Sequence, residues 1–291
     1  MYSQNGTKRS TGCYSPEIRR AAALFQSARR VVIGGGAGLS AAAGLLYSGP
    51  RFTGRFAPFI AKYGLTDMYS AGFYPFPNER ARWAYWAQHI LVNRIQPPAL
   101  PLYRQLYGLV GAREHFVITT NVDHQFQKAG FAPARVFAVQ GDYGELQCAR
   151  ACHGGLYPAE PVVRALSAAT RDCLVPDALV PRCPVCGGKM AVHLRVDQSF
   201  VEDDTWHEAC ARYEDFLRAC IDVPTVLLEL GVGFNTPGII RYPFERLALA
   251  YENFSLIRVN LSEARLPDEL KSRGVSLAGD MKDTLSALAA R

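Results

Sequence analysis

The chain has 291 residues, of which 49% are hydrophobic, and it carries a formal net charge of +6. This length and apolar content suffice for one large domain or two unequal ones with a buried core. No stretch approaches about 18 consecutive apolar residues, and no apolar run follows a basic start, which argues against a membrane span and a signal peptide and favours the cytoplasm. The 32 basic and 26 acidic residues are interspersed, so the charge pattern does not predict nucleic-acid binding.

The predicted elements alternate between helices and short apolar strands. Residues 1–15 are polar and rich in turn formers, and we expect a loosely ordered lead-in. Pro16 then opens a predicted helix, EIRRAAALFQSA, followed by a strand, RVVIG, and by GGAGLSAAAG, a glycine turn with a small-residue helix. Further predicted strands are HFVITT (115–120), RVFAVQG (135–141), TVLLELG (225–231) and SLIRVNL (255–261).

Near-continuous apolar strands separated by helical stretches indicate a parallel sheet that is buried on both faces. Two insertions interrupt the pattern, one aromatic-rich and helical, the other rich in cysteine. We therefore predict an α/β protein with a doubly wound, Rossmann-like domain that binds a nucleotide and a smaller helical and zinc-ribbon-like domain. The large domain takes residues 16–55, 109–147 and 202–291, and the small domain takes residues 56–108 and 148–201.

Eight cysteines in a chain without a secretion signal argue against a disulfide framework. Two close pairs stand out, Cys148-x3-Cys152 and Cys183-x2-Cys186, and four thiolates in two pairs suit a tetrahedral structural zinc. The alternative is four reduced, inert cysteines. His153 is an alternative ligand, whereas no such pairing exists for Cys13, Cys173, Cys210 and Cys220.

The glycine turn at residues 34–38 lies where a strand hands over to a helix. Glycine allows the backbone to approach a diphosphate, and the first N–H groups of a helix favour negative charge. A packing turn between strand and helix is the alternative. Leu39 leaves the G-x-G-x-x-G pattern incomplete, and no acidic residue ends a second strand at the expected distance, so a hydride-transfer dehydrogenase is disfavoured.

Several short motifs recur in a fixed order. TTNVD (119–123) follows one predicted strand and Gln140-Gly141 ends the next, which places both at the carboxyl edge of the sheet, where ligands bind. Together with GAGLS (36–40), they resemble the sirtuins, whose patterns are GAG-[IA]-S, TQN-[IV]-D, HG and two cysteine pairs. The resemblance runs from about residue 16 to the C-terminus, through LRVDQSFVE (194–202), GVGFNTPG (231–238), Val259-Asn260 and Gly279-Asp280.

Two departures from the sirtuin pattern are informative. Sirtuins carry G-I-P-D-F-R after the first motif, where this chain reads GLLYSGPRF (44–52), and Gln140 stands in the place of their histidine base. With LLYSG-x-RF and V-Q-G-D, the chain resembles the macrodomain-linked class M of microbial sirtuins. This resemblance implies a protein ADP-ribosyltransferase that modifies a lipoylated carrier similar to the glycine-cleavage H protein, with functional links to a macrodomain hydrolase and a lipoate ligase.

The glutamine separates two reactions that share a first step, the cleavage of the nicotinamide–ribose bond of NAD+. Asn121 can hydrogen-bond the ribose or a water, and Asp123 can hold the carboxamide or oppose the developing positive charge. Deacylation then needs a base for the ribose 2′-hydroxyl, and an amide has no useful basicity. Loss of a general base costs a factor of about 10² to 10⁴, so direct transfer of ADP-ribose is favoured, with Gln140 as an orienting group.

The predicted function is therefore NAD+-dependent mono-ADP-ribosyl transfer. The alternatives are a deacylase or delipoylase with another base, for which His124 is a minority candidate, and an inactive NAD+ sensor, against which the retained Asn121 and Asp123 argue. For Ser40 and Asn260, a helix cap and a strand-end turn are alternatives to ligand binding. The expected catalytic residues are Asn121, Asp123, Gln140 and Arg195, and the expected NAD+ contacts are Gly36, Ala37, Gly38, Ser40, Tyr47, Phe52, Asn121, Asp123, Gln140, Gly231, Gly233, Asn235, Asn260 and Asp280.

Overall fold

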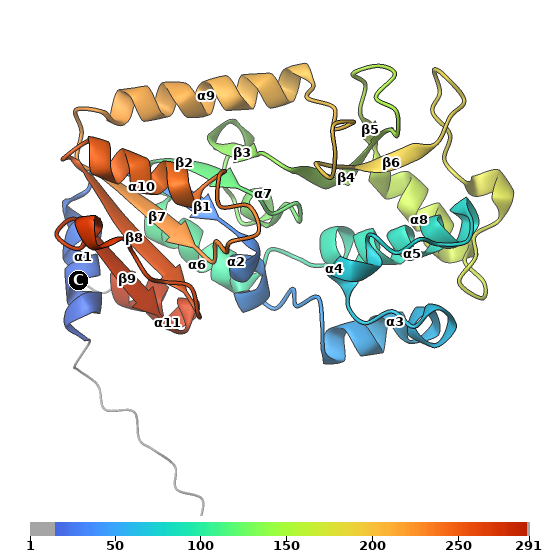
Figure 1. The fold of residues 1–291 in the computed structure, drawn as a ribbon, viewed down its shortest axis with the longest axis horizontal. Helices are drawn as coiled ribbons and strands as arrows, with labels where there is room; N and C mark the ends of the chain where they lie inside the picture. The colour runs from blue at the N-terminus through green and yellow to red at the C-terminus, as the bar shows by residue number, and fades with distance from the viewer. Residues whose placement is uncertain (1–14, 290–291) are drawn as a thin grey trace, which may run out of the picture.

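The structure of the protein, a computed structural model, describes residues 15–289 and contains two sheets (Figure 1). Six parallel strands form the larger sheet in the order β3-β2-β1-β7-β8-β9, and three antiparallel strands form the smaller one in the order β5-β4-β6. The predicted α/β fold with a doubly wound parallel sheet is confirmed. The predicted lead-in up to residue 14, and Cys13 within it, lie outside the described residues.

The strands of the large sheet are mostly apolar because helices cover both faces. In β1, Val31 and Ile33 pack toward one face and Val32 packs toward the other, and all three are fully buried. This burial on two sides accounts for the continuous apolar runs of the sequence. The six strands are β1 (Arg30–Gly35), β2 (Glu114–Thr119), β3 (Val136–Ala138), β7 (Thr225–Leu230), β8 (Phe254–Asn260) and β9 (Gly274–Ala278).

Two groups of helices cover these faces. On the first face lie α1 (Pro16–Ser27), α6 (Pro101–Val110) and α11 (Met281–Ala289), and on the second lie α9 (Asp204–Cys220) and α10 (Arg241–Ala250) (Figure 1). None of the helices within residues 15–289 is long and apolar enough to cross a membrane. Short helical segments complete this part of the chain: α2 (Ala37–Ala42), α7 (Gln125–Lys128), η2 (Pro133–Arg135) and η4 (Asp268–Leu270).

The helical insertion and the small sheet share an aromatic core. Trp83 and Tyr85 are fully buried there, whereas Tyr69 and Phe73 are exposed to 60% and 61%. Tyr74, Phe76 and Trp86 also pack in this core. Its elements are α3 (Pro50–Tyr63), α4 (Met68–Ala71), α5 (Glu79–Ile90), the π-helical turn η1 (Leu91–Ile95), β4 (Gly141–Cys148), β5 (Tyr157–Pro158), α8 (Ala159–Ala169), η3 (Asp177–Leu179) and β6 (Met190–Leu194).

The strand predicted over residues 135–141 is wrong at its C-terminal end. Strand β3 stops at Ala138, and Gln140 lies in the turn that follows it. Gly141 has φ = 94° and starts β4, which pairs with β6 of the small sheet. A left-handed residue at this point redirects the chain, because only glycine adopts such a φ without strain.

The division of the chain into two domains stays a proposal, and the packing favours shifted boundaries. Residues 141–147 belong to the small sheet, although the sequence assigns them to the large domain. Conversely, Leu102 and Leu106 of α6 pack on the large sheet, and Phe52 packs in the aromatic core. The sequence locates most of these apolar segments, but which of them pack together depends on the path of the chain.

Candidate active site

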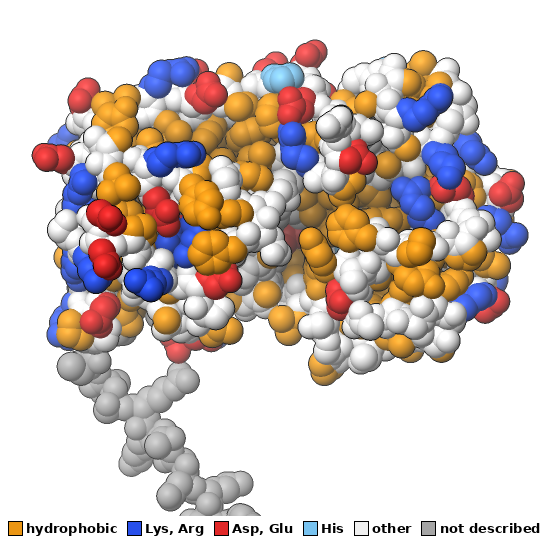
Figure 2. Space-filling model, in the orientation of Figure 1, with side chains coloured by type: hydrophobic (Ala, Val, Ile, Leu, Met, Phe, Trp, Pro, Cys, Tyr) orange, Lys and Arg blue, Asp and Glu red, His pale blue; other side chains and the backbone are white. Residues whose placement is uncertain are grey.

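The predicted site residues meet at one edge of the large sheet. Gly36 follows β1, Asn121 follows β2, Gln140 follows β3 and Gly231 follows β7, while Asn260 ends β8. Since all six strands are parallel, these positions share the carboxyl edge, where ligands bind in open α/β sheets. On the face shown in Figure 2, the surface is hollowed between the part over the large sheet and the part over the helical insertion.

The glycine turn after β1 lies against the end of β7. A Cβ atom on Gly36 would lie 2.6 Å from the carbonyl oxygen of Gly231, and one on Gly38 would lie 2.8 Å from the Gly231 Cα. The N–H of Gly38 donates to the Gly231 oxygen at 2.9 Å. The turn thus has the packing role that was the alternative in the sequence, while its contact with NAD+, through the exposed Ala37 for example, stays a proposal.

A buried hydrogen-bond network joins Asn121 and Asp123 to two other elements. The Ser40 hydroxyl donates to Asp123 Oδ2 and lies 2.8 Å from the hydroxyl of Tyr103. Asn121 Nδ2 donates to the carbonyl oxygen of Gly36 at 2.9 Å and to the Tyr103 hydroxyl at 3.2 Å. The N–H of Gln125 donates to Asp123 Oδ1 at 3.0 Å. The two side chains are therefore fixed before any ligand binds.

Burial changes the acidity of this network. Asp123 is only 5% exposed, and desolvation raises the pKa of its carboxyl group, although hydrogen bonds from Ser40 and Gln125 act in the opposite direction. Tyr103 is fully buried, and its pKa also lies well above the usual value because of desolvation. The tyrosine therefore stays a neutral hydrogen-bonding group between Ser40 and Asn121.

Gln140 is partly buried, and its backbone is held from both sides. The N–H of the preceding residue, Val139, donates to the carbonyl oxygen of Thr119 at 3.0 Å. The Gln140 carbonyl oxygen accepts from the N–H of Arg195 at 3.1 Å. The structure thus brings Arg195 beside Gln140. The Arg195 guanidinium pairs with Glu202 and lies 4.3 Å from the ring centroid of Phe200. It is an ion-paired, stacked side chain next to the site.

Asp142, two residues after Gln140, belongs to a cluster of charged residues that the sequence did not predict. Asp142 Oδ2 lies 2.7 Å from Nδ1 of His124, and Asp142 Oδ1 accepts from Nε of Arg94 at 2.7 Å. His124 has φ = 64°, a left-handed conformation that is uncommon for residues other than glycine. The 2.7 Å contact shows that the His124 ring faces Asp142.

The loop after the glycine turn is anchored to the aromatic core. The hydroxyl of Tyr47 lies 2.9 Å from that of Tyr143 in β4, and burial raises the pKa of Tyr47 to about 12. Phe52 is 2% exposed and stacks on Phe56 with 5.5 Å between the ring centroids. The charge of Asp123 also contributes to the raised pKa of Tyr47, so Tyr47 lies near the site, whereas Phe52 fills the core. The predicted contact of Phe52 with NAD+ requires that this packing open.

The last expected NAD+ contacts shape the loops after β7 and β8. Asn260 donates from Nδ2 to the carbonyl of Val232 at 3.0 Å, and its Oδ1 accepts from two N–H groups, those of Ser262 and Glu263. A Cβ atom on Gly233 would lie 3.1 Å from Glu263, and Asn235 is exposed.

Asp280 is exposed and accepts from the N–H of Lys282 at 2.7 Å at the start of α11. The side chains of Asn260 and Asp280 thus fix turns at the carboxyl edge.

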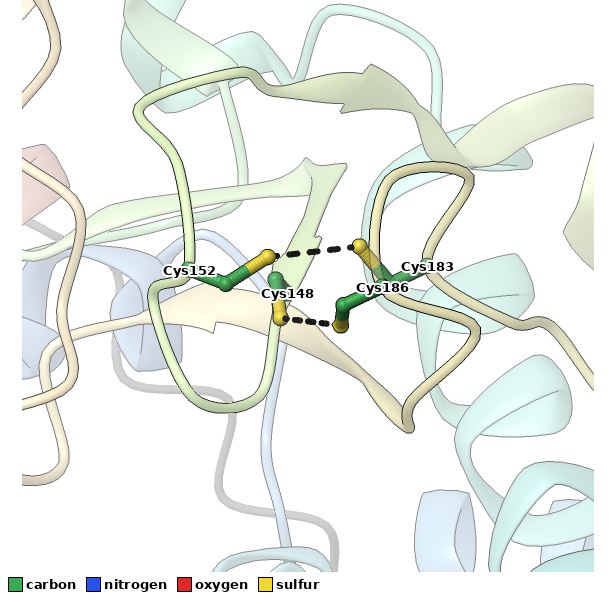
Figure 3. A group of neighbouring side chains, drawn as sticks. All are labelled: Cys148, Cys152, Cys183 and Cys186. Atoms are coloured by element: carbon green, nitrogen blue, oxygen red, sulfur yellow. Dashed lines mark hydrogen bonds between the residues drawn. The ribbon is translucent and has the colours of Figure 1, made fainter.

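The four predicted cysteine ligands converge (Figure 3). Their Sγ atoms all lie within 4.8 Å of one another, with 3.8 Å between Cys148 and Cys186 and 3.7 Å between Cys152 and Cys183. Zinc–sulfur bonds of about 2.3 Å in a tetrahedron place neighbouring sulfurs about 3.8 Å apart. The cluster thus fits zinc. Nδ1 of His153 lies 3.1 Å from the Cys152 sulfur, at the edge of the cluster.

The thiols of this cluster differ in acidity. A hydrogen bond from Arg150 lowers the pKa of Cys186 to about 6, whereas desolvation and the neighbouring sulfurs raise the pKa of Cys152 to about 12. A divalent cation removes this difference, because it stabilises every coordinated thiolate. The other described cysteines, Cys173, Cys210 and Cys220, lie outside the cluster.

Comparisons with known proteins assign the chain to a family. No family model matches the chain. A protein ADP-ribosyltransferase of Staphylococcus aureus is 35% identical over 271 residues, which cover 93% of this chain and 85% of that protein. A solved sirtuin structure covers 93% of this chain and 97% of its own, with 20% identity and a TM-score of 0.58. The chain belongs to the sirtuin family.

A second relative of this sirtuin carries a further activity. A probable bifunctional ADP-ribose hydrolase/ADP-ribosyltransferase of Fusarium oxysporum f. sp. cubense is 34% identical over 264 residues. These residues cover 87% of the present chain but only 44% of the fungal protein. The predicted family and enzyme class are confirmed: the protein is an NAD+-dependent sirtuin of the ADP-ribosyltransferase type.

Sequence reasoning missed two parts of the site. Tyr103 lies in a helix without any motif, so no local signal points to it. Asp142 was quoted only as part of V-Q-G-D, and its contact with His124 joins positions 18 residues apart. Pairs of this kind become visible only when the chain is folded.

Proposed function

We propose that this sirtuin transfers a single ADP-ribose from NAD+ to a protein acceptor and releases nicotinamide. The observation that carries the proposal is Gln140, which stands in a turn at the carboxyl edge of the sheet beside an intact network of Asn121, Asp123 and Ser40. An amide cannot take a proton from a ribose hydroxyl near neutral pH. The site thus keeps the groups for the first step and lacks the base that deacylation requires.

The chemistry assigned to each side chain follows from its surroundings. As the C1′–nicotinamide bond breaks, its electron pair moves to the nicotinamide nitrogen, and positive charge develops on the ribose. The ionised carboxylate of Asp123 opposes that charge from a buried position, where electrostatic interactions are strong. Asn121 and Gln140 orient the ribose and the incoming acceptor, whose nucleophilic atom forms the new bond to C1′ and releases its proton to solvent.

The acceptor in this proposal is a lipoylated carrier protein similar to the glycine-cleavage H protein. Its support is the resemblance of LLYSG-x-RF and V-Q-G-D to class M sirtuins. The exposed aromatic side chains Tyr69 and Phe73 offer apolar surface on the helical insertion to such a partner.

A macrodomain hydrolase that removes the modification belongs to the same proposal, because the Fusarium relative combines hydrolase and transferase in one name. A lipoate ligase would supply the lipoylated carrier.

A structural zinc held by Cys148, Cys152, Cys183 and Cys186 completes the proposal. The sulfur–sulfur distances suit a tetrahedral site. When bound, the metal would join Cys148 and Cys152, at and after the end of β4, to Cys183 and Cys186, which precede β6. It would thus link two segments of the small sheet. Its role is to hold the fold, because four protein ligands leave no open position for a substrate.

Intact-mass measurement tests the proposed activity. The purified protein is incubated with NAD+ and a lipoylated H-type carrier, and in parallel with an acyl-lysine peptide. We expect the carrier to gain one ADP-ribose while the peptide keeps its acyl group. Deacylation of the peptide would instead show that another residue serves as base, and binding of NAD+ without nicotinamide release would indicate a sensor.

Variants of Gln140 test its role in transfer. We expect Gln140→Ala to lower transfer, because the amide no longer orients the ribose or the acceptor, while NAD+ binding persists. Gln88→Ala is a matched control, since this partly buried glutamine donates to the backbone of Arg55 in the helical insertion. Unchanged transfer in Gln140→Ala would remove the orienting role, and loss of NAD+ binding would make the residue a ligand contact.

A further inference from the structure

Asp142 makes three polar contacts, two with other segments of the chain and one within its own strand, β4. Oδ2 is hydrogen-bonded to Nδ1 of His124 at 2.7 Å. Oδ1 accepts hydrogen bonds from Nε of Arg94 at 2.7 Å and from the N–H of Gly144 at 2.6 Å. The side chains of Asp142 and Arg94 are each 18% exposed, so this is a partly buried ion pair.

The partners of Asp142 come from segments that border the site. His124 follows Asp123 directly, and Asp142 lies two residues after Gln140. A backbone hydrogen bond runs in parallel, from the N–H of Tyr143 to the carbonyl of Val122 at 3.0 Å. The loop that carries Asn121 and Asp123 is thus joined to the Gln140 turn at two adjacent points.

The third segment is the exit of the helical insertion. Arg94 lies in the π-helical turn η1, a rare conformation that is frequent at functional sites. Lys128 donates to the carbonyl oxygens of Arg94 and Pro97, and Gln125 accepts from the N–H of Leu100 at 2.9 Å. Side chains of the segment after β2 therefore hold the C-terminal end of the helical insertion in place.

The Asp142 carboxylate keeps its charge within the fold. Burial acts against the ionised form of Asp142, but the hydrogen bond from His124 and the charge of Arg94 outweigh it and lower the pKa of the carboxyl group. The negative charge of Asp142 in turn contributes to the raised pKa of Asp123, after the larger effect of burial. The two carboxylates are therefore close enough to interact.

We propose that Asp142 is a positioning residue that sets the Gln140 turn against the loop of Asn121 and Asp123. The inference rests on the proposed function of this site and names a further residue for the same reaction. The left-handed φ of His124 is consistent with it, since strained backbone persists only where its surroundings hold it in place. Asp142 acts through Gln140 and through His124, and it needs no contact with NAD+.

A double-mutant cycle tests the proposal on the full-length protein. Asp142→Ala, Gln140→Ala and the double variant are compared by steady-state release of nicotinamide from NAD+ with the carrier present. We expect Asp142→Ala to lower kcat by about 10²-fold, because small misplacements of a catalytic group have effects of this size, and to leave KM for NAD+ little changed. The double variant should be no slower than the slower single variant, because the two residues act as a unit.

Two conservative variants separate position from charge and from proton transfer. In Asp142→Asn, the amide oxygen still accepts from Arg94 and Gly144 and its nitrogen can donate to His124, so most of the activity should return. In His124→Asn, the shorter amide still reaches toward Asp142 and tolerates a left-handed φ, so activity should also persist. If His124→Asn were as slow as Asp142→Ala, the imidazole would itself carry protons and the positioning role would be wrong.

A control and a second pair of variants complete the test. Asp172→Asn removes another carboxylate of the small domain, which pairs with Lys62 at 2.6 Å, and it should leave kcat unchanged. If Asp142→Ala does not fold, His124→Gly replaces it in the cycle, because glycine suits the φ of this position and still removes the contact. Additive effects in either cycle, within about twofold, would overturn the proposal and make Asp142 a purely structural residue.

The failure of this inference is distinguishable from failure of the proposed function. If the carrier gains no ADP-ribose but an acyl-lysine peptide stimulates nicotinamide release, the proposed acceptor is wrong. The same cycle is then measured with the peptide, because the cleavage of NAD+ precedes both reactions. Coupling between Asp142 and Gln140 in that assay would support the positioning role, and its absence would contradict it.

Discussion

Asp123 combines burial with a charge that the reaction needs. It is 5% exposed, and its hydrogen bonds from Ser40 and Gln125 do not fully compensate for the lost hydration, so the pKa of the carboxyl group is raised. Burial of such a carboxyl group makes its ionised form less favourable, because the charge loses its hydration. The site thus holds a carboxylate whose charge is destabilising to the fold and useful in the transition state.

The pH dependence of the wild type follows from the raised pKa of Asp123. Ionisation is required for catalysis, so kcat should fall with acid as pH passes through this pKa, at higher pH than the value of about 3.9 for a free aspartate. The stability contribution has the opposite sign: because the folded-state pKa is raised, protonation favours the folded state as pH falls. The rates of the wild type across the acid range measure the first trend. The difference in thermal midpoint between the wild type and Asp123→Asn measures the second, because other carboxyl groups such as Asp142 also titrate in this range.

The Asp123→Asn variant separates these two trends. We expect loss of nicotinamide release with a thermal midpoint equal to or above that of the wild type, because the amide removes a buried charge while keeping most hydrogen bonds. Asn121→Asp is the reverse control, since it adds a buried charge and should lower the midpoint. A marked fall in the midpoint of Asp123→Asn would contradict a destabilising carboxylate.

The contact between the glycine turn and β7 shows how secondary-structure elements form the floor of the site. Gly231 has φ = 63°, and a Cβ atom there would lie 2.3 Å from the N–H nitrogen of Leu39. Gly36 and Gly38 approach Gly231 from the other side. Three glycines therefore bring the ends of β1 and β7 closer than any side chain would permit.

A substitution in this turn tests the packing argument. Gly38→Ala places a methyl group 2.8 Å from the backbone of Gly231, and backbone cannot move aside as a flexible side chain can. We expect a loss of about 1–3 kcal/mol in the free energy of unfolding, with a higher KM for NAD+ because the turn shifts. Denaturant unfolding and steady-state kinetics measure the two effects.

Gly54→Ala is the matched control for that substitution. Gly54 lies in helix α3, and a Cβ atom there meets nothing within 4 Å. Alanine should stabilise the helix by about 0.5–1 kcal/mol, because it loses less conformational freedom than glycine. Equal effects of the two substitutions would show that the turn has no special packing requirement.

The two sheets form the largest scale of organisation, and the chain passes between them near the site. Gly141 leads from β3 of the large sheet into β4 of the small sheet, one residue after Gln140. The cysteine cluster ends β4 and precedes β6, so it closes the small sheet at the end away from Gln140. The stability of this sheet therefore bears on the position of the Gln140 turn.

Metal removal tests the proposed zinc at this scale. The purified, reduced protein should contain one zinc per chain, and a chelator should lower its thermal midpoint, because a ligand present at a thousandfold of its dissociation constant stabilises the folded state by about 4 kcal/mol. Cys183→Ser should do the same without chelator. Cys210→Ser, outside the cluster, is the control and should leave metal content unchanged. A folded, reduced and metal-free wild type would exclude the zinc.

The sequence by itself determined the features that depend on neighbours along the chain. The apolar runs predicted five of the six parallel strands in approximate position, and the spacing of two cysteine pairs predicted the cluster that the fold assembles. The motifs around Asn121, Asp123 and Gln140 led to the family and the enzyme class, which the comparisons confirmed. Glycine, proline and the spacing of hydrophobic residues determine local structure, so these features can be predicted from the sequence alone.

Only the tertiary structure decided which distant side chains meet. The sequence read residues 135–141 as one strand and left Ser40 between a ligand contact and a helix cap. The fold ends β3 at Ala138, and it places the Ser40 hydroxyl against Tyr103 and Asp123, which are 63 and 83 residues away. The contact of Asp142 with Arg94 spans 48 residues. Such pairs carry no local pattern, because their geometry is set by the path of the backbone and by which faces of the sheets are covered.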